Sequence, residues 1–309
     1  MKVALTGGSG FVGGCILNLL LNSGYQVKAL KNRTPISISH ENLEVIQGSL
    51  DDTECLQNLV EGTDIVIHCG GIVAAKKAKT FYDINQHATE TLIERAQNST
   101  SKRFLLISSI AARKANLSHY AKSKRSGEEA LEQSSIENWD IFRLSAVYGP
   151  GDMQILGLFK ILKSGIGIVP KSKHNRLSLI FVEDVARAVL EWINKDTSNK
   201  EIYEISDDQM SGYSWQEIYQ QAGHLLGVNI KTITLPKSLL YTYAFIKQSL
   251  AKIKGKSEIM TFGKVREMCH PNWSTDQNNF ATKSTWSPNV NLEGGLKVTF
   301  DWYKHRNLL

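Results

Sequence analysis

Short apolar runs alternate with amphipathic segments through the first half of the chain. The amphipathic segments carry apolar residues at helical spacing, and strands that alternate with helices in this way predict a parallel sheet covered on both faces. We therefore expect an α/β fold with a doubly wound parallel sheet. The predicted strands are residues 3–5, 26–30, 43–46, 64–68, 103–107 and 139–144, and the predicted helices are 16–24, 53–60, 84–97 and 118–133.

The regular alternation of predicted strands and helices ends at about residue 151. The chain of 309 residues is long enough for one large domain or two unequal lobes. In its second half we expect strands at 177–182 and 201–205, a loop at 165–170, and helices at 154–163, 185–193, 215–226, 237–254 and around Leu296 to Tyr303.

A glycine-rich turn joins the first predicted strand to the first predicted helix. Residues 6–13 read TGGSGFVG, with four glycines in eight positions. Gly7 can form the tight turn, Gly10 lets a pyrophosphate approach the backbone, and Gly13 lets the helix pack close to the strand. The start of the helix offers free N–H groups to phosphates. The turn therefore predicts a Rossmann-type dinucleotide site, and the alternative is a turn into an ordinary α/β core.

Four further positions bear on the cofactor: Lys31, Arg33, Gly70 and Asn85. Lys31 and Arg33 follow the second strand, where NAD-binding folds usually place Asp or Glu, so the pair favours the 2′-phosphate of NADP over NAD. A solvated basic turn is the alternative interpretation. Gly70 follows the fourth strand and leaves room for a ligand, whereas His68 is expected to face the core. Asn85 is a candidate for a helix cap, a buried polar bridge or a cofactor contact.

Ser109, Tyr120 and Lys124 form a candidate catalytic group. Tyr120 and Lys124 are four residues apart on a predicted helix and project from one face. A nearby ammonium group lowers the pKa of a phenol, which then exchanges a proton with a substrate alcohol or ketone. Ser109, at the end of the adjacent strand, is expected to hydrogen-bond the substrate oxygen. The group predicts hydride transfer at a secondary alcohol or ketone.

With these motifs, the chain resembles the extended short-chain dehydrogenase/reductase family, also called the NAD-dependent epimerase/dehydratase family. The matching stretches occur in family order over essentially the whole chain: 6–13, 64–71, the Asn85 helix, 105–109, 120–124, 143–152 (RLSAVYGPGD) and 181–188 (FVEDVARA). The resemblance implies Tyr120 as acid/base, Lys124 on the nicotinamide ribose and Ser109 as substrate anchor. The candidate cofactor-binding residues are Gly7, Gly10, Phe11, Val12, Gly13, Lys31, Arg33, Ser49, Leu50, Gly70, Asn85, Tyr120, Lys124 and Val147.

The resemblance also implies a division of the chain. Residues 1–152 are expected to form the Rossmann domain, part of the chain after 177 is expected to return to it, and 153–309 are expected to form mainly a substrate-binding lobe. Two departures from the family pattern concern the reaction. Residues 110–114 (IAARK) contain no carboxylate, which argues against dehydration, and only eleven positions separate Ser109 from Tyr120, which leaves little loop for a large substrate.

Composition and charge limit the remaining possibilities. The net charge of +6 suits an anionic cofactor or substrate, but the lysines are spread out, so we expect no nucleic-acid partner. The four cysteines show no metal-ligand spacing, so we expect no metal and a reducing, cytoplasmic location. The chain has no apolar run of transmembrane length, and Met1 leads directly into a strand without a signal peptide. Residues 237–254 are interpreted either as an amphipathic helix packed on the second lobe or as a membrane-surface or lipid-substrate face.

Three functions are compatible with these features. The first is an NAD(P)-dependent oxidoreductase of sterol or flavanol-reductase type, with NADP preferred and NAD possible. The second is a nucleotide-sugar epimerase with retained NAD, in which Lys171, Lys173 and Arg176 meet the diphosphate. The third is a cofactor-binding assembly subunit without turnover. The resemblance also makes a homodimer possible.

Overall fold

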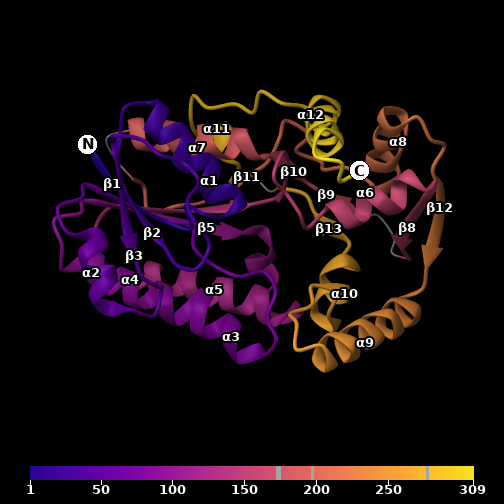
Figure 1. Ribbon diagram of the computed structural model, residues 1–309, viewed down its shortest axis with the longest axis horizontal. Coiled ribbons are helices and arrows are strands. Elements are labelled where there is room, and N and C mark those ends of the chain that lie inside the picture. The colour runs from indigo at the N-terminus through magenta and orange to yellow at the C-terminus, as the bar shows by residue number, and fades with distance from the viewer. Residues whose placement is uncertain (172–174, 196–197, 276–277) are drawn as a thin grey trace.

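A seven-stranded parallel sheet forms the centre of the larger part of the molecule (Figure 1). The computed structural model describes residues 1–171, 175–195, 198–275 and 278–309. The strand order is β11-β6-β5-β4-β1-β2-β3, and each neighbouring pair is parallel. The strands are β1 (Lys2–Thr6), β2 (Gln26–Lys31), β3 (Leu43–Gln47), β4 (Ile65–His68), β5 (Arg103–Ser109), β6 (Trp139–Leu144) and β11 (Ile202–Ile205).

The order of the strands reverses next to β1. The chain runs from β1 outward to β2 and β3, then returns to the other side of β1 and continues through β4, β5 and β6. The carboxyl ends of parallel strands meet at one edge, and a ligand in such a sheet binds where the order reverses. The expected doubly wound parallel fold is therefore confirmed. A ligand is expected at the edge of the sheet formed by the carboxyl ends of β1 and β4.

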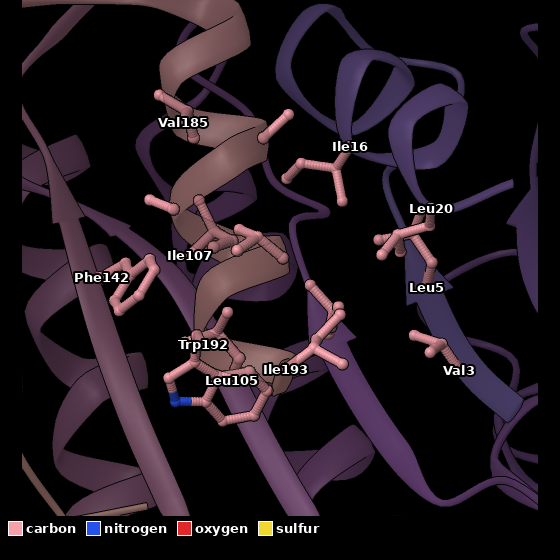
Figure 2. Packing of buried hydrophobic residues seen from close by; sticks show 14 of the residues in the cluster. Val3, Leu5, Ile16, Leu20, Leu105, Ile107, Phe142, Val185, Trp192 and Ile193 are labelled. Carbon is pink, nitrogen blue, oxygen red and sulfur yellow. The ribbon is translucent and has the colours of Figure 1, made fainter. Parts of the chain in front are cut away.

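Helices cover both faces of the sheet. On one face, α1 and α7 pack their apolar side chains against β1, β5 and β6, as the labelled residues in Figure 2 show. On the other face, α2, α4 and α5 supply Leu56, Leu92 and Leu131 to a second core. The helices are α1 (Phe11–Asn22), α2 (Thr53–Val60), α4 (Ala88–Gln97), α5 (His119–Glu132) and α7 (Val182–Asn194).

The helix expected at 84–97 begins earlier and is not uniform. It consists of α3 (Ala78–Tyr82), a π-helical turn η1 (Asp83–His87) and α4. Within the wide turn, the carbonyl oxygen of Asn85 lies against Gly127 of α5, where a Cβ would approach it to 2.7 Å. The residue pattern shows helical periodicity but does not reveal a widened turn, because that turn depends on contact with α5.

A second, smaller group of elements has its own apolar core. Its members include Phe159, Tyr219, Phe300 and Tyr303. The elements are α6 (Leu156–Lys163), β8 (Ile166–Pro170), α8 (Trp215–Leu226), β12 (Lys231–Leu235) and α12 (Leu292–His305), with the short strands β7 (Ala146–Tyr148), β9 (Arg176–Leu177), β10 (Leu179–Phe181) and β13 (Asn272–Trp273). Helix α11 (Phe280–Lys283) packs on β11 instead, and its Phe280 belongs to the core of the large sheet.

The prediction of a loop at 165–170 is wrong, because Ile166–Pro170 form strand β8, which pairs in parallel with β12. The strand packs closely against the ring of Tyr219. The Tyr219 hydroxyl donates to the Ile168 carbonyl oxygen at 2.6 Å, and a Cβ on Gly167 would lie 2.5 Å from the same ring. Gly167 therefore serves close packing here, and the partner strand 65 positions further along (231 − 166) supplies the backbone hydrogen bonds.

Helix α9 (Lys237–Ile253) lies along the outer edge of the smaller group, with α10 (Phe262–Met268) on its inner side (Figure 1). Pro236 precedes its first turn. Gly255, at φ +60°, ends it: the Lys256 amide donates to the Ala251 carbonyl and the Gly255 amide to the Lys252 carbonyl. Among the described residues, no helix is long and apolar enough to cross a membrane.

Candidate active site

The glycine turn fixes the start of α1 beside the ends of β1 and β4. Gly7 has φ +78°, and a Cβ there would lie 2.7 Å from the Cys69 carbonyl carbon. A Cβ on Gly13 would lie 2.1 Å from the Gly7 carbonyl oxygen, so only glycine lets α1 approach this closely. Gly10 is the N-cap and provides no side-chain cap, so Phe11 and Val12 begin the helix with amides available to an anion.

His68 belongs to a buried hydrogen-bond chain beneath this turn. The Gly70 amide donates to Thr6 Oγ1, which lies 2.6 Å from His68 Nδ1, and His68 Nε2 lies 2.9 Å from Thr89 Oγ1. Thr89 Oγ1 donates in turn to the Asn85 carbonyl oxygen. This chain is satisfied when neutral His68 carries its proton on Nε2, and burial lowers the pKa of His68 to about 3. The residue connects β4 to η1, as expected for a side chain facing the core.

Asn85 forms a buried polar bridge, which is one of its three expected roles. Its Oδ1 accepts from the Ile72 amide at 2.8 Å, and its Nδ2 donates to the Ile72 carbonyl oxygen and to Ser123 Oγ. The side chain therefore connects the loop after β4 to α5, the helix that carries Tyr120 and Lys124. That loop contains Gly70, where a Cβ would meet Leu50 Cδ1 at 3.0 Å, so Leu50 and Gly70 border the same edge.

Ser109, Tyr120 and Lys124 come together at the carboxyl end of β5. Ser109 Oγ accepts from the Ala111 amide at 3.2 Å and hydrogen-bonds the Tyr120 phenol. Ser118 caps α5 through the Ala121 amide and so fixes the turn that carries Tyr120. Lys124 is buried and its Nζ donates to the Ile107 carbonyl oxygen at 2.9 Å.

The phenol of Tyr120 is a weak acid in this setting. Burial raises its pKa to about 12, and the nearby carboxylates of Glu267 and Glu128 add to that shift. The hydrogen bond from Ser109 acts in the opposite direction because it favours the phenolate. Tyr120 therefore carries its proton at neutral pH and can donate it to a developing oxyanion.

Glu128 is a candidate positioning residue that the sequence reasoning missed. It is fully buried, accepts from Ser108 Oγ at 2.5 Å and from Arg143 at 2.5 Å, and raises the pKa of Lys124, which burial lowers. Its position four residues after Lys124 on the same helix was the available signal.

Glu267 of α10 is a second missed residue. It accepts from the hydroxyl of Ser118, the N-cap of α5, and Arg266 Nε donates to the Leu117 carbonyl oxygen at 2.5 Å. Helix α10 is thereby attached to the start of α5. A partner 149 positions away (267 − 118) leaves no local signal in the sequence.

The other predicted residues are distributed around this edge. Lys31 is the last residue of β2 and Arg33 is exposed just after it. Ser49 hydrogen-bonds Asp51. Val147 lies on β7, which leads into a turn at Gly151. A Cβ on Gly151 would lie 3.6 Å from the Phe11 ring. Away from this edge, Arg176 pairs with Glu217 at 3.0 Å, and Lys173 lies outside the described residues. Within the described ranges, no cluster of His, Cys, Asp or Glu is arranged to hold a metal ion.

Comparisons with known proteins agree with this arrangement. The model of the NAD dependent epimerase/dehydratase family matches residues 3–206. Ceramide reductase of Caulobacter vibrioides is 32% identical over 305 residues, which cover 98% of this chain and 94% of that protein. UDP-glucose 4-epimerase of Vibrio cholerae is 24% identical over 333 aligned residues, covering 99% and 96%. The crystal structure of gox2253 has the same fold, with a TM-score of 0.80 and 18% identity over 100% of this chain and 99% of that one.

Proposed function

Because the chain belongs to the NAD-dependent epimerase/dehydratase family, we propose that it is an NADPH-dependent reductase acting on the ketone of a long-chain, ceramide-like lipid. The placement of Ser109, at the end of β5, beside the phenol of Tyr120 carries the reaction type, because it brings a proton donor and an oxygen anchor together. The relationship to ceramide reductase over nearly the whole chain supports the substrate class.

The residues present fit a dinucleotide. The turn at Gly7 and Gly10 would hold the pyrophosphate against the uncapped start of α1, and Lys124 would hold the nicotinamide ribose. When bound, the reduced nicotinamide supplies the hydride for the carbonyl carbon. Tyr120 gives its proton to the carbonyl oxygen, Ser109 donates a hydrogen bond to the same oxygen, and the Lys124 ammonium stabilises the phenolate left behind. Solvent then returns the proton to Tyr120.

The raised pKa of Tyr120 predicts different pH profiles for the two directions. Reduction needs the neutral phenol, which is present at neutral pH because the pKa is raised to about 12. Oxidation needs the phenolate, whose fraction grows as pH rises. We expect reductive kcat/KM to be flat between about pH 6 and 8 and oxidative kcat/KM to increase by up to about tenfold per pH unit. Initial rates in both directions test this, and an oxidative rate that falls with rising pH would contradict the role of Tyr120.

Arg33 is proposed to contact the 2′-phosphate of NADP. We expect Arg33→Gln to raise the KM for NADPH about tenfold and to leave the KM for NADH unchanged, because a charge-assisted bond to phosphate is lost. Lys163→Gln, at an exposed lysine on α6, is the control. A wild-type preference for NADH, or an equal effect on both cofactors, would count against NADP.

The substrate class is tested by NADPH consumption with an oxidised ceramide, a steroid ketone and a UDP-sugar in parallel. Activity on the ceramide alone supports the proposal. Retained NAD together with turnover of the UDP-sugar would instead identify an epimerase, the function named for the more distant relative. Stable capture of a partner protein without turnover of any substrate would favour an assembly subunit. The four free cysteines support a reducing, cytoplasmic location as part of the proposal.

A further inference from the structure

Helix α9 presents a continuous apolar stripe to solvent. The stripe consists of Leu239, Tyr243, Ile246, Leu250 and Ile253, which recur four, three, four and three residues apart and therefore lie on one face. Their exposed fractions run from 47% to 83%, and Phe245 beside the stripe is 60% exposed. Isolated exposed apolar residues are common, but a stripe along an entire helix indicates an interaction surface.

A different face of α9 holds the helix in place. Leu240 and Ala244 are buried against Val265 of α10 and Cys269, the residue that follows α10. The helix is thus fixed through α10, and the stripe residues remain exposed on another face of the helix. Figure 1 shows α9 itself along the outer edge of the molecule. The exposed side chains can therefore be changed without disturbing the packed face.

Every charged residue within 237–257, which covers α9 and the turn after it, is positive. Residues 237–257 contain five lysines and no aspartate or glutamate, so this segment carries +5 while the whole chain carries +6. The lysines are exposed or half-buried, and they are Lys237, Lys247, Lys252, Lys254 and Lys256. A long lysine side chain can place its ammonium group at a polar boundary while its stem covers apolar surface.

We propose that α9 docks the protein on the surface of an anionic lipid bilayer, with the stripe inserted at the boundary of the acyl chains. Exposed leucine, isoleucine and aromatic residues bordered by lysines are typical of helices that lie in a membrane interface, and anionic headgroups attract a polybasic segment. Pairing of α9 with a second copy would bring two segments of charge +5 together, so charge complementarity favours the bilayer over self-association.

The docking surface is connected to the reacting groups through α10. The same helix that supports α9 also accepts from Ser118 at the start of the catalytic helix, through Glu267. A bilayer against α9 would therefore rest on the helix pair that is attached to the start of α5, the helix that carries Tyr120. This last point rests on the proposed function, whereas the docking itself does not.

The docking is tested by sedimentation of the full chain with vesicles, measured without substrate. We expect binding to vesicles of phosphatidylcholine mixed with phosphatidylglycerol, weak binding to phosphatidylcholine alone, and release by high salt. Ile246→Ser with Ile253→Ser should lower the partition coefficient by at least about tenfold. Lys252→Gln, Lys254→Gln and Lys256→Gln together should remove the preference for the anionic vesicles. Val298→Ser, at a residue of α12 that is 48% exposed, should change neither.

Circular dichroism and thermal unfolding of each variant establish that it is folded. Absence of binding to either vesicle, equal binding to both, or an unchanged partition coefficient in the isoleucine variant would overturn the proposal. So would a wild-type dimer in light scattering that Ile246→Ser converts to monomer, because a second copy would then cover the stripe. Turnover with detergent-dispersed substrate is a separate measurement, so a failed reductase proposal and a failed docking proposal are distinguishable.

Discussion

Replacing Tyr120 with Phe is expected to lower kcat by about 10²- to 10⁴-fold, because the substrate oxygen loses its proton donor. The change removes one hydroxyl from a half-buried ring that packs edge-on against Phe81, with centroids 6.3 Å apart, so the fold should be kept. Cofactor affinity should change little, because the proposed pyrophosphate site lies at the turn between β1 and α1. Single-turnover reduction, with cofactor binding followed by fluorescence, separates the two effects.

Tyr82→Phe is the matched control for this variant. The Tyr82 hydroxyl lies on the surface nearby, 3.0 Å from His119 Nδ1, and takes no part in the proposed proton transfer. Its removal should leave kcat within about twofold of wild type, as for most surface changes. Turnover in Tyr120→Phe equal to that of Tyr82→Phe would refute the proposed mechanism.

The second large effect is expected at Gly13. A Cβ there would lie 2.1 Å from the Gly7 carbonyl oxygen, so Gly13→Ala must push α1 away from the turn. Overpacking of this kind lowers the free energy of unfolding by about 1–3 kcal/mol. Displacing the amides at the start of α1, which are proposed to bind the phosphates, should also lower kcat/KM for the cofactor by about 10²-fold, because catalysis depends on the position of the nicotinamide.

The next residue provides the control, because Gly14 lies in the same helix. A Cβ on Gly14 would come no closer than 3.4 Å to the Gly8 carbonyl oxygen, which is ordinary contact. Gly14→Ala should raise the free energy of unfolding by about 0.5–1 kcal/mol, since alanine favours the helix. Urea unfolding and cofactor titration of both variants decide the question. Similar behaviour of the two variants would show that helix approach at Gly13 does not control the site.

Local patterns predicted the sheet and the residues at its edge. Each central strand is a short apolar run beside glycine or polar residues, so β1, β4 and β6 could be located from a few neighbouring positions. The family suggested by the motifs at 6–13 and 120–124 is confirmed by the match over residues 3–206. The preference for NADP and the roles of the site residues remain predictions.

Features that depend on distant partners could not be predicted in this way. Strand β8 looks like a glycine-containing loop because its partner β12 is far along the chain. The bond between Ser118 and Glu267 joins two segments that carry no shared pattern, and the wide turn at Asn85 follows from packing on α5. Sequence periodicity reports which side of an element is buried, and it says little about which element covers that side.

The core between α1 and α7 limits where the chain can be cut and when its folding can be completed during synthesis. That core draws on Trp192, Tyr203, Phe280 and Trp286 as well as on β1 and β5. Trp286 lies 281 positions after Leu5 of β1 (286 − 5). The packing of this core is therefore expected to be completed only after residue 286 has left the ribosome. A recombinant fragment ending at residue 152 would leave apolar residues such as Phe142 uncovered and is expected to aggregate.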